Sequence, residues 1–214
     1  MFFKIIALIL PFFVLLPNSF SKEISVFKFT KEEFDQLKVR KIKKYTSYTL
    51  GSNANGNYLK AEASGQASGL GKEILINLNE TPYINITWKV EKDLTGINER
   101  TKKGHDYAAR VFVIKKTGAT ALSNRAINYI FSSNENIGDS WPSPFTKKSI
   151  DYVLSTTIKN NNEWVTVKSN VKEDFLELHN LNVNELNGVA IMTDTDNSKL
   201  TAISYYQNIF FSEN

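Results

Sequence analysis

The chain has 214 residues, of which 42% are hydrophobic and 22% charged, so it is long enough for one domain with a substantial core and too apolar to be disordered. It has no cysteine and two histidines, which excludes disulfides, thiolate chemistry and histidine-rich metal centres. The formal net charge of +4 is small and scattered, and we therefore expect no binding to nucleic acid.

The N-terminus has the pattern of a secretory signal peptide. Lys4 precedes an apolar run over residues 5–16, and the small residues Ser19 and Ser21 follow that run. As a helix the run would extend about 18 Å, short of the roughly 30 Å of a hydrocarbon core. We therefore expect cleavage after Ser21. This predicts a signal peptide over residues 1–21, a single exported domain over residues 22–214, no stable membrane insertion, and a periplasmic or secreted location in a bacterium.

Beyond the signal peptide, most of the chain has the period-two pattern of β-strands. The clearest strand covers residues 83–91, where Ile84, Ile86 and Trp88 share one face. We predict strands over residues 24–29, 57–63, 71–78, 83–91, 106–115, 124–132, 149–156, 163–171, 188–193 and 201–212. Residues 138–144 form the longest irregular stretch, which we predict to be a loop.

Two short helices are predicted from their N-terminal caps. Thr30 is followed three residues later by Glu33, and Asn170 is followed three residues later by Glu173. Two helices cannot cover about ten strands, so the sheets must bury each other. The sequence therefore predicts an all-β fold, a two-sheet antiparallel jelly-roll sandwich of about ten strands with two short helices, in which Trp88 lies between the sheets.

A charged segment over residues 99–110 leads into one of these strands. Asp106 and Arg110 alternate with Ala108, and we expect them to share a strand face that continues with Phe112. A buried arginine needs a partner, because an unpaired buried charge costs several kcal/mol. One interpretation is a polar site with Arg110 as donor and Asp106 or Glu99 as acceptor. The alternative is a structural ion-pair network.

Two further segments are candidates for a site. Asp194, Asp196 and Asn197 could offer oxygen ligands to calcium, but the glycine and distal glutamate of a full calcium loop are missing, and a turn without metal is the alternative. Trp141 lies between prolines in the predicted loop, either as an exposed platform for a sugar ring or as a plug on the end of the sandwich. No spacing brings two carboxylates together as a glycosidase pair.

The order of four stretches resembles a known family. They are residues 88–90 with 99–102, residues 106–111, residues 141–146, and residues 188–197 with Ala202, Tyr205 and Tyr206. In this combination the chain resembles the bacterial domain of unknown function 3047 family, departing from it at His105, where an acidic residue is expected, and at Gln207, where a glycine is expected. The resemblance implies only that the chain has the fold of this family and is exported. More loosely, residues 205–211 are similar to the last strand of carbohydrate-binding-module jelly rolls.

We therefore expect an exported, non-catalytic protein that binds a glycan or another polar component of the cell envelope. One alternative is a carbohydrate-active enzyme on the same sandwich, and another is an envelope scaffold that binds a protein through a sheet face. No cofactor is expected apart from the calcium alternative. The candidate ligand-binding residues are Glu99, Arg100, Asp106, Arg110, Trp141, Asp194, Asp196 and Tyr205.

Overall fold

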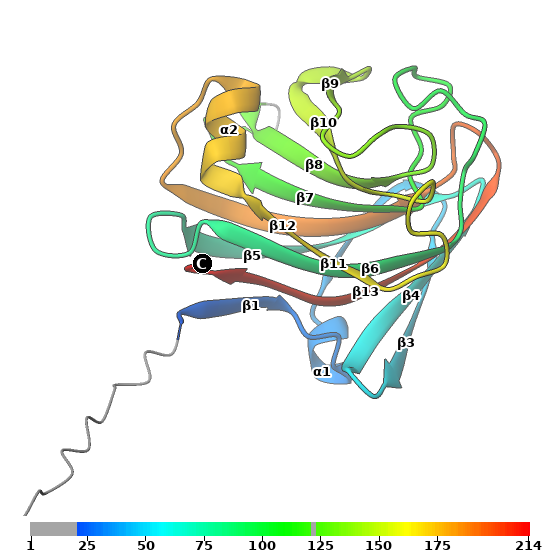
Figure 1. Cartoon of the computed structure of the whole chain (residues 1–214), viewed down its shortest axis with the longest axis horizontal. Helices are drawn as coiled ribbons and strands as arrows, with labels where there is room; N and C mark the ends of the chain where they lie inside the picture. Colours follow the sequence, from blue (N-terminus) through cyan, green and yellow to red (C-terminus); the bar gives the residue numbers. More distant parts are fainter. Residues whose placement is uncertain (1–20, 121–122) are drawn as a thin grey trace, which may run out of the picture.

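The computed structural model describes residues 21–120 and 123–214 and folds them into two stacked β-sheets (Figure 1). The predicted signal peptide lies almost entirely outside the described residues. The first sheet consists of six strands, which are β1 (Glu23–Phe27), β3 (Ser47–Asn53), β4 (Gly56–Ser64), β6 (Tyr83–Lys92), β11 (Val165–Asn170) and β13 (Thr201–Ser212). Their order is β11-β6-β13-β4-β3, and β1 pairs with the C-terminal part of β13.

The second sheet has seven strands in the order β2-β5-β12-β7-β8-β10-β9. These strands are β2 (Lys38–Lys43), β5 (Ala67–Asn77), β7 (Ala109–Lys115), β8 (Arg125–Ser132), β9 (Ser140–Ser143), β10 (Thr146–Thr156) and β12 (Glu185–Asp194). The predicted all-β jelly-roll sandwich is confirmed. Among the described strand pairs, β8 and β10 are the one parallel pair, because β9 and the preceding loop carry the chain back before β10 begins.

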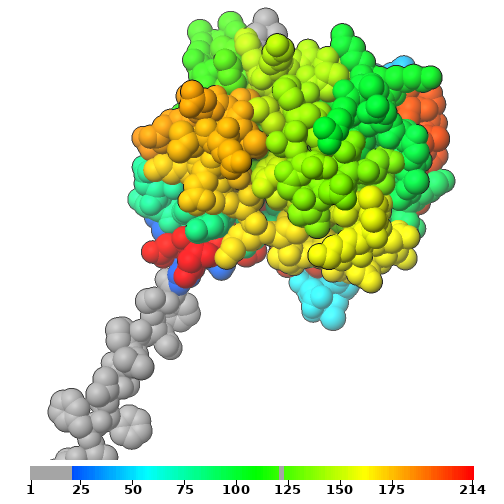
Figure 2. Space-filling model, turned by 45° about the horizontal axis from the view of Figure 1, so that its top comes forward, coloured from blue at the N-terminus to red at the C-terminus, as the bar shows by residue number. Residues whose placement is uncertain are grey.

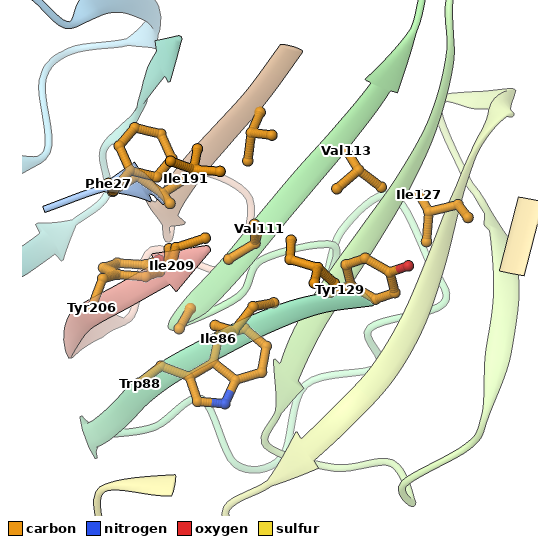
Figure 3. Close-up of a cluster of buried hydrophobic side chains, with 14 of the residues drawn as sticks. Phe27, Ile86, Trp88, Val111, Val113, Ile127, Tyr129, Ile191, Tyr206 and Ile209 are labelled. Carbon is orange, nitrogen blue, oxygen red and sulfur yellow. The ribbon is translucent and has the colours of Figure 1, made fainter. Parts of the chain in front are cut away.

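The core lies between the two sheets and is built from the inward faces of their alternating strands (Figure 3). Trp88 on β6 is fully buried, as predicted, and its ring centroid lies 5.5 Å from that of Phe131 on β8. Its indole Nε1 donates a hydrogen bond to Ser155 Oγ on β10 at 2.9 Å. One side chain of the first sheet thus contacts two strands of the second.

Both predicted helices form and begin at the predicted caps. Thr30 Oγ1 accepts from the backbone N–H of Glu33 at the start of α1 (Lys31–Phe34), and Asn170 Oδ1 accepts from that of Glu173 at the start of α2 (Val171–His179). α2 closes one end of the sandwich, where Phe175 enters the core (Figure 1). No helix in the described ranges is long and apolar enough to cross a membrane.

Three strands were absent from the sequence-based prediction. All six residues of β2 are exposed, so this edge strand shows no alternation of buried and exposed positions. β3 mixes small and polar residues, so its sequence lacks the clear alternation of apolar and polar positions that predicts a strand. β9 contradicts the prediction of a loop over residues 138–144: it pairs with β10 at the edge of the second sheet, where a proline such as Pro142 can be accommodated.

Candidate functional site

An open cleft of about 600 Å³ lies on the outer face of the second sheet. The alternation of side chains along each strand separates this cleft from the core. On β7, Val111 and Val113 point between the sheets, whereas Arg110, Phe112 and Ile114 line the cleft. As predicted, Arg110 and Phe112 share one face of the strand, and this face lines the cleft.

Small residues make the middle of the cleft floor flat. Gly188 and Ala190 line the cleft on β12, and Gly69 and Gly71 line it on the neighbouring β5. Ala190 is the register partner of Gly71 on one side and of Phe112 on the other. A ligand can therefore approach the backbone beside an aromatic ring. This floor was not predicted from the sequence, although the small residues at alternate positions of the two strands are a signal for it.

Arg110 stands at one side of this floor and is 5% exposed. Its Nη2 donates to Asp194 Oδ2 at 2.6 Å, and its guanidinium lies over the rings of Tyr107 and Phe112, at 5.1 Å from each ring centroid. Its Nε is buried without a hydrogen-bond partner. Nη1 has no partner among the described residues and is the part of the group that remains available to a ligand.

The partner of Arg110 differs from the prediction. Glu99 and Asp106 were the predicted acceptors, but the side chain that accepts is Asp194, 84 residues further along the chain. β7 begins only at Ala109, so Asp106 belongs to the preceding loop and does not share a strand face with Arg110. Burial raises the pKa of Asp194 to about 8, although Arg110 acts in the opposite direction. The ion pair therefore offsets only part of the cost of burying this carboxylate.

Asp106 fastens the loop before β7 to the turn after β12. Its carboxylate accepts hydrogen bonds from the backbone N–H groups of Asn197 and Ser198 and from Asn197 Nδ2. Oxygens of Asp106, Asp194 and Asp196 lie within 4.8 Å of one another. The first two carboxylates are already engaged by these donors and by Arg110, whereas calcium takes six to eight oxygen ligands. Calcium binding at Asp194, Asp196 and Asn197 stays a prediction.

His105 forms a second buried polar pair on the same side of the cleft. The imidazole is 5% exposed, and its Nε2 lies 2.8 Å from Oδ2 of the fully buried Asp151. Asp151 Oδ1 accepts from Asn128 Nδ2 at 2.7 Å, and Asn128 Oδ1 accepts from Ser149. A contact between residues 46 positions apart leaves no local signal.

Three of the predicted site residues, Glu99, Arg100 and Trp141, instead form a separate cluster on the same sheet face, in which Arg100 is exposed. Glu99 is 1% exposed and accepts from Ser132 Oγ and the backbone N–H of Ser133, so it holds a loop in place. Burial raises the pKa of Glu99. Arg100 donates two hydrogen bonds to Glu135 and lies 4.6 Å from the ring centroid of Trp141.

Trp141 is 7% exposed and packs with Tyr107, Ile130 and Val153. The expectation of an exposed indole as a sugar platform is therefore wrong, and the alternative of a plug describes its surroundings. Figure 2 shows this side of the molecule, with the lime-coloured region of β9 and β10 in its middle and α2 in orange beside it. This cover leaves the cleft open over β2, β5, β12 and β7, with its edge at Asn128 on β8 and Ser149 on β10.

Tyr205 lies on the other sheet and does not join the remaining candidates. It is on β13, where its hydroxyl donates to Glu91 at 2.6 Å and its ring contacts Tyr58 and Trp164. Neighbouring side chains on a strand point to opposite faces. Because Tyr206 is buried in the core, Tyr205 faces away from the core. The structure thus brings together Asp106, Arg110, Asp194 and Asp196, and separates them from Glu99, Arg100, Trp141 and Tyr205.

The fold and the site define the class: a two-sheet jelly-roll protein with an open cleft on the outer face of one sheet. Within this class, the chain belongs to the family described as "Protein of unknown function (DUF3047)", whose model matches residues 32–210. The sequence matches none of the curated proteins with which it was compared.

Several solved structures are similar to the chain at low sequence identity. A derivative of the Cel12A cellulase of Rhodothermus marinus is 10% identical, with a TM-score of 0.46, over 90% of this chain and 99% of that one. The xyloglucanase domain of NopAA from Sinorhizobium fredii, solved with cellobiose, is 12% identical, with a TM-score of 0.46, over 82% and 92%. The family 11 xylanase from Neocallimastix patriciarum is 10% identical, with a TM-score of 0.30, over 91% and 97%.

Proposed function

We propose that this protein is an exported, non-catalytic binding protein that holds a glycan in the cleft over the second sheet. The observation that carries the proposal is the cleft floor, in which Gly71 and Ala190 leave a flat surface beside the ring of Phe112. A sugar ring has an apolar face that stacks on such a surface and hydroxyl groups that need polar partners. Arg110 and Asn197 supply these partners at the walls.

The positions of the acidic side chains favour binding over hydrolysis. A glycosidase places two carboxyl groups roughly 5–9.5 Å apart on either side of the bond to be cleaved. Glu73 is the register partner of Gly188, six positions from Asp194 on β12, so the two acids lie about 20 Å apart along the cleft. Asp194 and Asp196 are close to each other but belong to one side of the cleft, and Asp194 is held by Arg110.

Filling the floor tests the proposal. The variant Ala190→Phe places a ring where the floor is now flat, and we expect it to weaken glycan binding at least about tenfold, equivalent to about 1.4 kcal/mol. Binding is measured by calorimetry with the oligosaccharide that the unmodified protein selects from a glycan array. Thr49→Phe is the matched control, because Thr49 is an exposed strand residue of the other sheet. Equal affinity of both variants and the unmodified protein would exclude the cleft as the glycan site.

Export is the second part of the proposal. β1 begins at Glu23, so cleavage after Ser21 would leave every strand of the sandwich intact. We expect the protein purified from a bacterial host to start at Lys22 and to be released with the periplasmic fraction. N-terminal sequencing of the purified chain measures this directly. A chain that starts at Met1 and sediments with membranes would show that residues 5–16 act as an anchor.

A further inference from the structure

The side of the cleft next to Tyr107 carries two nitrogen-bearing side chains that are each held from behind by a buried carboxylate. Arg110 is held by Asp194, and His105 is held by Asp151. All four of these residues are at most 5% exposed. Side chains fixed in this way lose little freedom when a ligand binds, so the cost of ordering them is already met by the fold.

The hydrogen bonds define what each side chain offers to the cleft. The carboxylate of Asp151 accepts from Asn128 at one oxygen, and at the other it faces His105 Nε2, which we assign as the protonated nitrogen. Nδ1 of His105 then has a free lone pair and no partner among the described residues. Arg110 offers a hydrogen-bond donor instead of an acceptor, because its cationic Nη1 has no partner among the described residues. The wall therefore presents one charged donor and one acceptor.

These two groups are close enough for one ligand. The ring of Tyr107 lies 5.1 Å from the imidazole of His105, centroid to centroid, and 5.1 Å from the guanidinium carbon of Arg110. The imidazole and the guanidinium are therefore about 10 Å apart at most. Both residues line the cleft together with Asn128. Adjacent groups of a short oligosaccharide can reach both.

The charges around the cleft also favour an anion. Five basic residues line it: Lys38, Arg40, Lys72, Arg110 and Lys116. One of them, Lys72, is bonded to Glu33. Of the acidic residues that line it, Glu73 is paired with Lys38 and Lys116, and Asp194 with Arg110, which leaves Asp196 without an ion pair in the described chain. Arg40 lies on β2 opposite Gly69 and has no acidic partner among the described residues. Among the residues that line the cleft, the basic groups thus outnumber the acidic ones.

We propose that the ligand of the cleft is an acidic glycan, in which a sugar carboxylate binds Arg110 Nη1 and a sugar hydroxyl donates to His105 Nδ1. This inference rests on the proposed glycan-binding function and specifies the class of its ligand. A residue with a carboxylate and free hydroxyls, as in a polyuronate, supplies both partners. A charge-assisted hydrogen bond to the guanidinium is the stronger of the two contacts.

The experiment compares an oligogalacturonate with its methyl ester, which has the same chain without the charges, and with a neutral cello-oligosaccharide of equal length. We expect the acid to bind at least about tenfold more tightly than its ester, and its affinity to fall with added salt while that of the ester does not. Equal affinities of acid and ester, or tighter binding of the neutral glycan, would overturn the inference and leave the proposed function standing. Failure of all three to bind, with no other glycan bound, would overturn both.

A variant tests the role of His105 without leaving a buried charge unpaired. The double variant His105→Phe, Asp151→Asn removes Nδ1, keeps a ring against Tyr107 and keeps an acceptor for Asn128. We expect it to bind the oligogalacturonate at least about tenfold more weakly. His179→Phe is the matched control, because His179 bonds the backbone of Ala126 and does not line the cleft. Unchanged affinity of a folded double variant would remove His105 from the site and overturn its assigned role.

Discussion

Replacement of Trp88 by alanine is expected to lower the free energy of unfolding by about 3–5 kcal/mol, the usual loss for a large aromatic residue in a core. Trp88 is the largest fully buried side chain, and it joins the two sheets through Phe131 and Ser155. Alanine would leave a cavity between the sheets and take the hydrogen-bond donor away from Ser155. The change is measured by urea unfolding followed by circular dichroism.

Trp164 provides the matched control for this measurement. It is 36% exposed on the outer side of the first sheet, where it contacts Tyr58 and Tyr205. We expect Trp164→Ala to cost less, about 1–2 kcal/mol, because this side chain is partly exposed and its aromatic contacts are worth about 1 kcal/mol. Equal losses for the two variants would show that Trp88 is not held between the sheets as described here.

The variant Asp194→Ala is expected to destabilise the protein by about 3–5 kcal/mol, because it leaves the buried guanidinium of Arg110 without its counter-charge. Arg110 Nη2 and Asp194 Oδ2 are 2.6 Å apart, and the two side chains are 6% and 2% exposed. Urea unfolding again gives the free energy. Asp196→Ala is the control, since Asp196 is less buried and has no side-chain ion pair among the described residues, and it should change stability by roughly 0.5 kcal/mol or less.

A double variant separates the loss of a charge partner from the loss of packing. Arg110→Met combined with Asp194→Ala removes both charges, and we expect it to be more stable than Asp194→Ala alone. If Asp194→Ala unfolds at the same urea concentration as the unmodified protein, the ion pair does not hold β7 against β12. Arg110 would then be free to act on a ligand alone.

Local sequence patterns were enough to predict the sandwich. Period-two alternation located most strands, and for residues 83–91 it also identified the buried face with Trp88. The caps at Thr30 and Asn170 predicted where both helices begin, because capping depends on residues only three positions apart. The requirement that a buried arginine be paired was equally readable from the sequence. The predictions failed at edge strands, since the fully exposed β2 and the proline-containing β9 lack the pattern of a half-buried strand.

The sequence by itself therefore determined the fold class, the helix caps, the burial of Trp88 and the need of Arg110 for an acidic partner. Only the tertiary structure decided that this partner is Asp194, that Asp151 holds His105, that Trp141 is covered, and that small residues of β5 and β12 meet in a cleft floor. The physical reason is the register of strands far apart in the chain. Alternation fixes which face a side chain occupies, but pairing between distant strands fixes its neighbours.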